Sequence, residues 1–296
     1  MIYDCLIIGA GPGGIKSAVA LKEAGYQVAI LEFSMPGGKA NIAPRVDNYP
    51  GFKEISGPDL AMEFYNEMIS NNIEFLPRKV LEIKKENNLF KLITDGDEYI
   101  SKSVIVATGT DEEKLNLENE KEVFGHGLSY CAICDGHFFR NRITVVVAED
   151  KYALSEAIYL AKLAKEVIVI TSKKELVGNN KLKDELASFP NVRYIHERKI
   201  TKLISNPLKQ IELDDGSLID VDGLFPLLGY IPNTSFIKNK ELLDEDGFIK
   251  VNEKQETSIP GLFAIGDVTS RELKQIYLAV LDASRAVKAI KEYLDE

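Results

Sequence analysis

The sequence predicts an α/β protein of two domains, and three observations support this prediction. An apolar strand followed by a glycine-rich turn and a helix begins near residue 2. A second strand–turn–helix pattern, ITVVVAEDKYALSEAIYL, begins at Ile143. A chain of 296 residues is also long enough to form two hydrophobic cores.

The first pattern, YDCLIIGAGPGGIKSAVALKEAGYQVAILEF, has every part of a Rossmann-like β-α-β unit. Tyr3 to Ile8 and Gln27 to Leu31 are its two predicted strands. The glycines Gly9, Gly11 and Gly14 follow the spacing G-x-G-x-x-G. They allow a tight turn, a close approach of a diphosphate and close packing of the helix, whose N-terminus attracts phosphate. Glu32 can accept hydrogen bonds from ribose hydroxyls, so we expect a bound dinucleotide. A purely structural turn would leave Glu32 unexplained.

Composition and charge exclude several classes of protein. No window approaches 18 consecutive apolar residues, and the N-terminus lacks the pattern of a signal peptide. We therefore expect a cytoplasmic protein with no membrane span. Three cysteines are too few for a secreted disulfide framework. A formal net charge of −10 argues against general nucleic-acid binding.

A cysteine pair in SYCAICDGHFF is the strongest candidate for chemistry. Cys131 and Cys134 have the spacing of a disulfide or a redox-active dithiol. A zinc site would need two more ligands, which the remaining Cys5 and three histidines do not supply in pattern, so we expect no metal. Asp135 can shuttle a proton as the disulfide opens. Its alternative role is that of a turn residue before Gly136.

Further stretches make the sequence resemble a known family. The segments PGGKANIAPRVDNYPGF, VIVATGT and GLFAIGDV are typical of two-dinucleotide flavoproteins. With HGLSYCAICDG, DGLFPLLGYIPNT and Lys274-Gln275-Ile276, they follow the order and spacing of bacterial-type thioredoxin reductases over essentially the whole chain.

The resemblance implies a homodimeric enzyme that contains FAD and reduces thioredoxin. It implies an FAD domain of residues 1–111 and 238–296, interrupted by a dithiol domain of residues 112–237. The linking segments would be Thr110 to Glu113 and Asn233 to Phe236. The inserted domain would rotate about them, because one buried pose cannot serve both the flavin and a protein substrate.

Roles for individual residues follow from the same resemblance. Cys134 would face the flavin, Cys131 would attack thioredoxin, and Asp135 would be the acid/base. Asp267 would hold the FAD ribityl chain, although a turn aspartate is its plain alternative. The implied FAD-binding residues are Gly9, Gly11, Pro12, Gly13, Gly14, Glu32, Gly38, Lys39, Asn48, Val80, Ala107, Thr108, Gly109, Gly266, Asp267, Gln275 and Ile276.

The second strand–turn–helix pattern departs from the family. Aligned on EAIYL, the three glycines of its turn become Ala148, Glu149 and Asp150, and the expected basic cluster becomes Thr171-Ser172-Lys173. We expect Asp150 to cap a helix that starts at Lys151. A carboxylate about 4 Å from a phosphate charge costs about 4 kcal/mol at an effective dielectric of about 20. That energy is roughly a thousandfold in affinity, so we expect no NADPH here. The alternative is a different NADPH pose that uses Lys173 or Lys174.

The source of electrons is therefore open to several interpretations. Loss of the NADPH motifs resembles the ferredoxin-dependent flavin thioredoxin reductases, which is our main prediction. The alternatives are an NADPH-dependent thioredoxin reductase, a dithiol oxidase that uses oxygen, and a redox sensor that is not an enzyme. Residues 162–209 contain eleven Lys or Arg and five Asp or Glu, a net +6. This stretch could steer an acidic ferredoxin, or it could be an ordinary solvated exterior.

Overall fold

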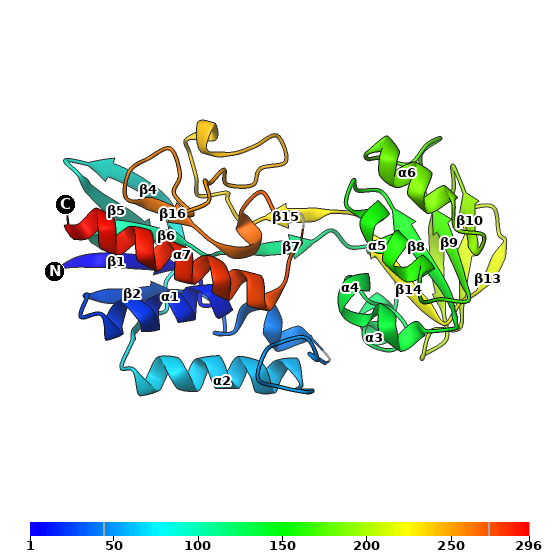
Figure 1. Cartoon of the computed structure of the whole chain (residues 1–296), viewed down its shortest axis with the longest axis horizontal. Coiled ribbons are helices and arrows are strands. Elements are labelled where there is room, and N and C mark those ends of the chain that lie inside the picture. Colours follow the sequence, from blue (N-terminus) through cyan, green and yellow to red (C-terminus); the bar gives the residue numbers. More distant parts are fainter. Residues whose placement is uncertain (44, 272, 296) are drawn as a thin grey trace. The chain divides into compact units, whose positions relative to one another are not determined.

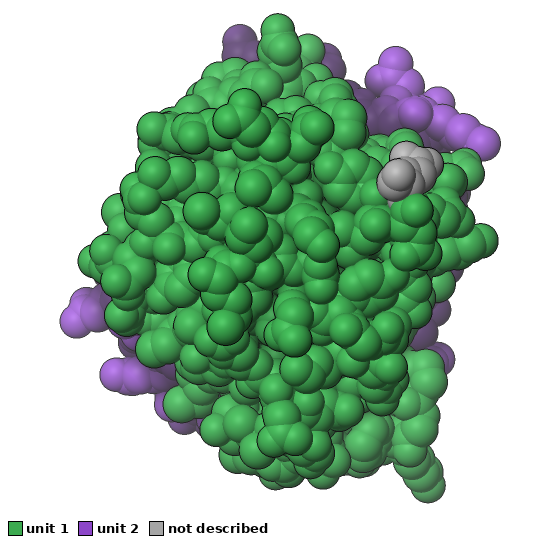
Figure 2. All heavy atoms as spheres, turned by 90° about the vertical axis from the view of Figure 1, so that its left-hand side faces the viewer, with its two compact units in different colours: residues 1–111, 231–296 green, residues 112–230 purple. Residues whose placement is uncertain are grey.

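The computed structural model describes residues 1–43, 45–271 and 273–295, so Pro44 of the quoted PGGKANIAPRVDNYPGF stretch lies outside it. The chain divides into two compact units (Figures 1 and 2). Unit 1 comprises Met1–Asp111 and Ile231–Glu296, and unit 2 comprises Glu112–Tyr230. The predicted α/β class is confirmed, because each unit contains a parallel sheet with helices packed on it.

Unit 1 is built on a seven-stranded mixed sheet with the order β3-β2-β1-β6-β5-β4. Its strands are β1 (Ile2–Ile8), β2 (Val28–Leu31), β3 (Glu74–Leu76), β4 (Val80–Glu86), β5 (Leu89–Thr94), β6 (Glu98–Val106) and β16 (Leu262–Ala264). Strands β3, β2, β1, β6 and β16 are parallel, whereas β4 and β5 add an antiparallel meander. The long strand β6 pairs with β5 through its first residues and with β16 through its last.

Two apolar cores cover the faces of this sheet. Alternation along β1 sends Cys5 and Ile7 to one core and Leu6 and Ile8 to the other. The first core is closed by three helices, in which α1 packs on both α7 and α2. The helices of unit 1 are α1 (Pro12–Glu23), α2 (Gly57–Ser70) and α7 (Ile276–Asp295), with short 3-10 helices η1 (Gly38–Ile42), η3 (Lys240–Leu242) and η4 (Gly266–Val268).

Unit 2 contains a four-stranded parallel sheet with the order β10-β9-β8-β14 and a separate antiparallel sheet, β11-β12-β13. The strands are β8 (Ile143–Ala148), β9 (Glu166–Ile170), β10 (Val192–Ile195), β11 (Ile200–Ile204), β12 (Gln210–Leu213), β13 (Leu218–Asp220) and β14 (Gly223–Leu227). The helices are α3 (Glu120–Val123), α4 (Ala132–Asp135), the 3-10 helix η2 (Gly136–Phe139), α5 (Ala153–Ala161) and α6 (Asn180–Ala187).

The parallel sheet of unit 2 lies between two different layers. Val146 packs with α5 and α6 in one core, whereas Val145 and Val147 pack with residues of the antiparallel sheet in the other. The carboxyl ends of β8 and β14 lie side by side, because Leu227 is the register partner of Ala148. In a sheet of this kind a ligand site is expected at these carboxyl ends.

Two short strands connect the units, and one of them differs from our expectation. Strand β7 (Thr110–Glu112) pairs with β15 (Tyr230–Pro232). The second boundary falls at Tyr230 and Ile231, earlier than the expected 237/238. The reason is that the expected hinge belongs to unit 1: the Thr234 hydroxyl donates to the Gly247 carbonyl at 2.9 Å. Phe236 is also buried in the core of that unit.

No helix in the described part of the chain combines the length and the apolar character needed to cross a membrane.

Candidate functional site

The glycine-rich turn of unit 1 holds the N-terminus of α1 open. Gly9 has φ +108, and a Cβ there would lie 2.4 Å from the carbonyl oxygen of Ala107. A Cβ on Gly14 would lie 2.0 Å from the Gly9 oxygen, so strand and helix approach too closely for any side chain. Gly11 is the N-cap of α1, and no side chain caps this end of the helix. A Cβ added at Gly11 would meet no protein atom within 4 Å. The first backbone N–H groups of α1 are thus left for a ligand.

Glu32 lies beside this turn. Its Oε2 accepts the Ala10 N–H at 3.1 Å, and its Oε1 accepts the Ser34 N–H at 2.9 Å. The carboxylate is therefore fixed at the end of β2, next to the diphosphate position that α1 offers. The open helix terminus and this placed acid fit the ADP half of a dinucleotide such as FAD.

Several of the other predicted residues converge on the same turn. A Cβ on Gly38 would lie 3.2 Å from Gly11 Cα, and one on Gly13 would lie 3.0 Å from the Ala279 oxygen of α7. Ala107 donates its N–H to Ile8 at 2.7 Å, next to Gly9. The loop after β16 is also close, since a Cβ on Gly266 would approach Ala279.

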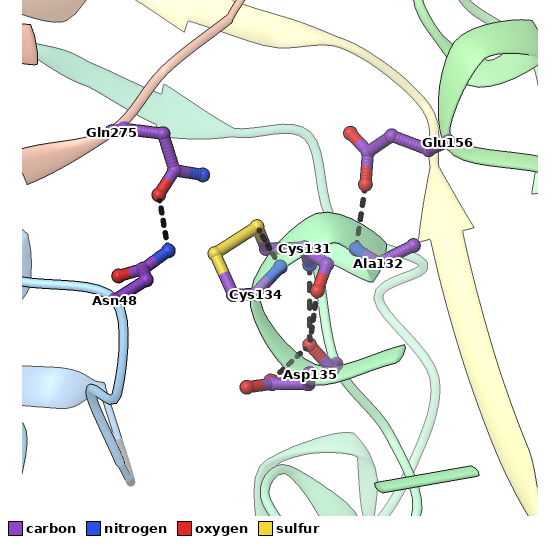
Figure 3. The surroundings of a disulfide bond; sticks show 8 residues. Asn48, Cys131, Ala132, Cys134, Asp135, Glu156 and Gln275 are labelled. Carbon is purple, nitrogen blue, oxygen red and sulfur yellow. Dashed lines mark hydrogen bonds between the residues drawn. A yellow bond between two sulfur atoms is a disulfide. The ribbon is translucent and has the colours of Figure 1, made fainter. Parts of the chain in front are cut away.

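A second group of predicted residues lies around the start of α7 and the end of β6. The amide of Asn48 donates to Gln275 Oε1 at 2.9 Å (Figure 3). Lys39 Nζ donates to Thr110 Oγ1 at 2.9 Å. The remaining members are Pro12, which begins α1; Thr108 and Gly109, which follow β6; Asp267, which lies in η4; and Ile276, which begins α7. Val80 is different, because it begins β4 and packs with Phe90 in the core on the other face of the sheet.

Lys274 is a residue of this region for which the sequence analysis proposed no role. Its Nζ donates to the carbonyl oxygens of Asp267 at 2.9 Å and Arg271 at 3.1 Å. Burial lowers the pKa of Lys274 to about 8, although the nearby Asp267 carboxylate acts in the opposite direction. This ammonium therefore holds the η4 loop in place at the cost of part of its hydration.

The cysteine pair lies in unit 2 and forms a disulfide. Cys131 and Cys134 are joined across the short helix α4, with a Cα–Cα distance of 5.3 Å. Cys131 is the N-cap of α4, and its Sγ accepts the Cys134 N–H at 3.2 Å. A thiolate at Cys131 would keep this hydrogen bond after reduction, which favours its ionised form.

Asp135 is held next to the disulfide by a residue that the sequence analysis missed. The Ser129 hydroxyl donates to Asp135 Oδ2 at 2.6 Å and accepts the Cys131 N–H at 3.1 Å (Figure 3). Ser129 is buried, whereas Asp135 and Cys131 are partly exposed. Ser129 orients the carboxylate that we expect to transfer a proton.

Glu156 is the second residue that the sequence analysis missed. It lies on α5, is buried, and its Oε2 accepts the Ala132 N–H at 2.6 Å (Figure 3). Ala132 is the first residue of α4, so the carboxylate lies at the N-terminus of the disulfide helix. Burial raises the pKa of Glu156 to about 7, which outweighs the lowering effect of the Ala132 and Ile133 N–H groups. A group that titrates near neutrality thus contacts the backbone between the two cysteines.

Glu156 makes the stability of the protein depend on pH. Its pKa is about 7 in the folded chain against an ordinary 4.5, so between these values the folded state holds a proton that the unfolded state has lost. Stability from this group is full below pH 4.5 and falls as pH rises to 7, by about 3 kcal/mol. We expect Glu156→Gln to gain in urea midpoint relative to wild type between pH 5 and pH 8. A difference that stays constant with pH would contradict the assignment.

The turn of the second strand–turn–helix unit is filled by its own carboxylates. Glu149 Oε1 accepts the Ser172 N–H at 2.5 Å and lies 3.5 Å from the Thr171 hydroxyl. Lys173 donates its Nζ to the Glu149 carbonyl at 3.0 Å. All three members of the Thr171-Ser172-Lys173 segment are therefore engaged by one acidic residue. The donors that would meet a nucleotide phosphate are already used.

The helix after this turn begins later than we predicted. It starts at Ala153 rather than Lys151, and its N-cap is Tyr152, which provides no side-chain cap. Asp150 forms a local turn instead: its Oδ1 accepts the Tyr152 N–H at 2.7 Å, and its carbonyl accepts the Ala153 N–H at 3.2 Å. The prediction of an N-cap was wrong, but the Asp150 carboxylate does bind a backbone N–H ahead of the helix.

A small pocket lies beside this turn, entirely within unit 2. No Lys or Arg is among the described residues that line it. Its polar lining consists of Glu112, Asp150, Glu156, Tyr130, Tyr152 and Tyr230. Three carboxylates and no cation make this pocket unsuited to a phosphate group.

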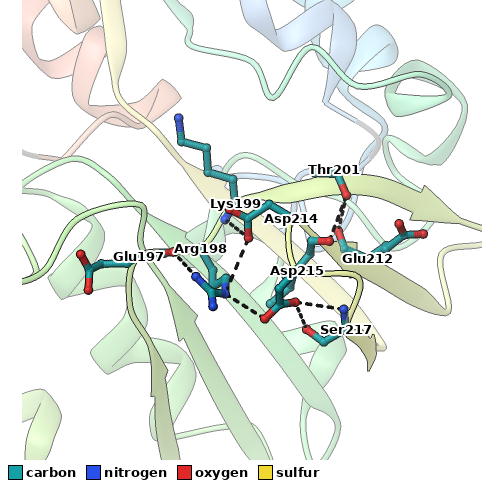
Figure 4. Close-up of polar contacts among 9 residues, drawn as sticks. Glu197, Arg198, Lys199, Thr201, Glu212, Asp214, Asp215 and Ser217 are labelled. Atoms are coloured by element: carbon teal, nitrogen blue, oxygen red, sulfur yellow. Dashed lines mark hydrogen bonds and ion pairs between the residues drawn. The ribbon is translucent and has the colours of Figure 1, made fainter.

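The expectation of a basic face over residues 162–209 is weakened by ion pairing. Arg198 lies 2.8 Å from Asp215 and 3.8 Å from Asp214 (Figure 4). Lys202 pairs with Glu212 at 2.9 Å. These acids lie just beyond the counted stretch, on the antiparallel sheet. Their charges cancel much of its net +6, so the ordinary solvated exterior is the better interpretation.

Among the residues that the structure describes, no three His, Cys, Asp or Glu side chains are grouped as a metal site.

Comparisons with known proteins agree with this geometry. A family model described as pyridine nucleotide-disulphide oxidoreductase matches residues 3–283. The thioredoxin reductase of Mycoplasma pneumoniae is 37% identical over 99% of this chain and 96% of that protein. The structure of thioredoxin reductase from Streptococcus pyogenes has a TM-score of 0.93, with 34% identity over 99% of this chain and 98% of that one. A ferredoxin-flavin thioredoxin reductase from Clostridium acetobutylicum has a TM-score of 0.55, with 30% identity over 99% of each chain.

Proposed function

Because the chain belongs to the pyridine nucleotide-disulphide oxidoreductase family and, within it, to the thioredoxin reductases, we propose that it reduces the disulfide of thioredoxin through Cys131 and Cys134. The enzyme is a flavin disulfide oxidoreductase, and we assign FAD as its flavin. The observation that supports this most directly is the disulfide at the N-terminus of α4, next to the Asp135 carboxylate.

Residues of unit 1 would hold the FAD. The N–H groups at the start of α1 would bind the diphosphate, and Glu32 would bind the ribose. Asp267, Asn48 and Gln275 have the positions that the resemblance gives to residues around the ribityl chain and the flavin ring. When bound, FAD supplies the electron pair that opens the cysteine disulfide.

The chemistry of the protein itself is thiol–disulfide exchange. Two electrons break the Cys131–Cys134 bond and leave a thiolate and a thiol. The Cys131 thiolate, stabilised by the Cys134 N–H, attacks one sulfur of thioredoxin and forms a mixed disulfide. Cys134 then attacks Cys131, which re-forms the disulfide and releases thioredoxin as a dithiol. Asp135, held by Ser129, transfers the protons that the leaving thiolates require.

We further propose that a reduced protein of the ferredoxin type, rather than NADPH, supplies the electrons. The contacts of Glu149 with Ser172 and Thr171 support this, because they use the donors that a nucleotide phosphate would need. The three carboxylates of the adjacent pocket support it independently. The similarity to the ferredoxin-flavin thioredoxin reductase from Clostridium acetobutylicum, at 30% identity, supports a donor of this type.

An NADPH-dependent thioredoxin reductase is the second candidate, and the comparisons favour it. The family model takes its name from the pyridine nucleotides. The Mycoplasma and Streptococcus relatives are named simply thioredoxin reductase. In this case NADPH would bind in a pose that avoids Glu149, with Lys173 or Lys174 near its phosphate.

An anaerobic titration of the purified flavoprotein separates the two candidates. Excess NADPH, then NADH, then photoreduced ferredoxin are added while the flavin absorbance is followed. We expect bleaching only with ferredoxin, because Glu149 and Asp150 repel a nucleotide diphosphate. Prompt bleaching with NADPH would overturn the assignment of a protein donor and leave thioredoxin reduction intact. Rapid oxygen use with small dithiols would instead indicate a dithiol oxidase.

The resemblance also implies a homodimer. An exposed apolar stripe on α2 supports this proposal, since Met62, Tyr65 and Ile69 lie on one face of the helix and large exposed apolar patches mark contact surfaces. Sedimentation of the FAD-loaded protein measures its mass in solution, and a monomer at micromolar concentration would count against the proposal.

A further inference from the structure

Two side chains accept hydrogen bonds from backbone N–H groups in the first turn of α4, the helix that carries the disulfide. Glu156 Oε2 accepts the N–H of Ala132 at 2.6 Å, while Cys131 Sγ accepts the N–H of Cys134 at 3.2 Å. One acceptor is a carboxylate, and the other becomes a thiolate when the disulfide is reduced. The same short helix terminus must therefore stabilise two negative charges in the reduced protein.

Simultaneous ionisation of both groups is unfavourable, because they are like charges in a site with little water. Glu156 is buried where α5 packs on α4, and burial already raises its pKa while the disulfide is intact and neutral. A thiolate at Cys131 can only raise it further. When two titrating groups interact in this way, they share protons as a pair.

We propose that Glu156 is a positioning residue that couples the redox state of Cys131–Cys134 to a proton: it takes up a proton when the disulfide opens and releases it when the disulfide re-forms. Two electrons break the S–S bond. One proton goes to the sulfur of Cys134, and a second goes to the Glu156 carboxylate instead of the Cys131 thiolate. Reduction then consumes two electrons and two protons, and Cys131 stays ionised for attack. The inference rests on the proposed function only in assuming that this disulfide is cycled.

Every element that packs around Glu156 also carries ionisable groups. The pocket residues place two further carboxylates and three tyrosines on its open side. Helix α6 packs on α5 as well, but its Glu185 pairs with Lys162, just beyond the opposite end of α5. The groups to consider in any pH dependence are Glu112, Tyr130, Asp135, His137, Asp150, Tyr152, Tyr230, Lys181, Lys183, Asp184 and Glu185.

The test compares Glu156→Gln with wild type in the full-length, FAD-loaded protein. The glutamine oxygen can still accept the Ala132 N–H, but the side chain no longer carries a charge or a proton. The equilibrium with dithiothreitol is measured between pH 7.5 and 8.5, where Glu156 is mostly ionised in the oxidised protein, together with the pH dependence of alkylation by iodoacetamide. In wild type the equilibrium constant for reduction by dithiothreitol should be nearly independent of pH. In Glu156→Gln it should rise with pH, up to about tenfold per unit, because one proton is then released.

The alkylation profile gives a second expectation. At pH 7 Glu156→Gln should show the same fraction of Cys131 thiolate as wild type, because a protonated Glu156 and a glutamine are both neutral. Glu120→Gln is the matched control, because Glu120 is a buried acid of the same unit that accepts the Leu117 N–H and the Tyr130 hydroxyl rather than an N–H of α4. It should behave as wild type. Equal pH slopes in wild type and Glu156→Gln, or a thiolate fraction at pH 7 that differs between them, would overturn the proposal.

A measurement on wild type alone covers the case in which Glu156→Gln does not fold. The infrared difference spectrum between reduced and oxidised protein at pH 8 should contain the carbonyl stretch of a newly protonated carboxyl group. Its absence would also overturn the proposal. Neither thioredoxin nor the natural donor is present in these experiments, so a failure to reduce thioredoxin leaves their outcome unaffected.

Discussion

Replacing either cysteine of the pair by serine should lower thioredoxin reduction by at least about a thousandfold, as expected when one member of a catalytic unit is removed. Without Cys131 no thiolate attacks thioredoxin. Without Cys134 the mixed disulfide has no sulfur to resolve it. The rate is measured as thiols appearing on oxidised thioredoxin, with light-driven reduction of the flavin as the electron source. This choice makes the result independent of the natural donor.

Cys5→Ala is the matched control for these variants. Cys5 is the third cysteine of the chain; it is fully buried in β1, and burial raises the pKa of its thiol to about 12. The control should retain the wild-type rate. If Cys131→Ser and Cys134→Ser both retained it as well, exchange through this disulfide would be excluded. Repeated turnover by wild type would in turn exclude the redox sensor that was the non-enzyme alternative.

The first β-α-β unit could be predicted from sequence because its signals are local. Gly9 and Gly14 stand where a backbone turn and a helix leave no room for a Cβ, and Glu32 ends the second strand. The second turn was harder. Asp150 has the residue type of an N-cap, but its carboxylate accepts the Tyr152 N–H, and the backbone formed a local turn before α5 begins at Ala153.

Contacts set by tertiary packing could not be read from the sequence. Glu156 lies 24 positions from Ala132, and only the packing of α5 on α4 brings them together. A signal was present, because an acidic residue interrupts the apolar helix LSEAIYLA. The basic stretch was misleading for the same reason: Asp214 and Asp215, which neutralise Arg198, come from the next strand connection and not from the counted segment.

Alanine substitutions at Gly11 and Gly14 should affect two different properties of the protein: Gly14→Ala its stability and Gly11→Ala its affinity for FAD. The comparison tests the FAD site. A Cβ at Gly14 would lie 2.0 Å from the Gly9 oxygen, so Gly14→Ala must move α1 away from the strand. We expect the protein without FAD to lose about 3 kcal/mol or more of stability, at the upper end of overpacking costs. A Cβ at Gly11 would touch no protein atom, and Gly11 has φ −74, which alanine adopts.

Gly11→Ala should therefore unfold within about 1 kcal/mol of wild type when FAD has been removed, since only a weak helix cap is changed. Its affinity for FAD should nevertheless fall at least about a hundredfold, because the methyl group occupies the space through which a diphosphate reaches the N–H groups of α1. Urea unfolding of the FAD-free proteins measures the first quantity, and equilibrium binding of FAD measures the second. FAD must be absent from the unfolding experiment, because a bound ligand adds its own stabilisation. A Gly11→Ala protein that binds FAD as wild type does would show that the diphosphate does not lie against this turn, even though the helix N-terminus is open.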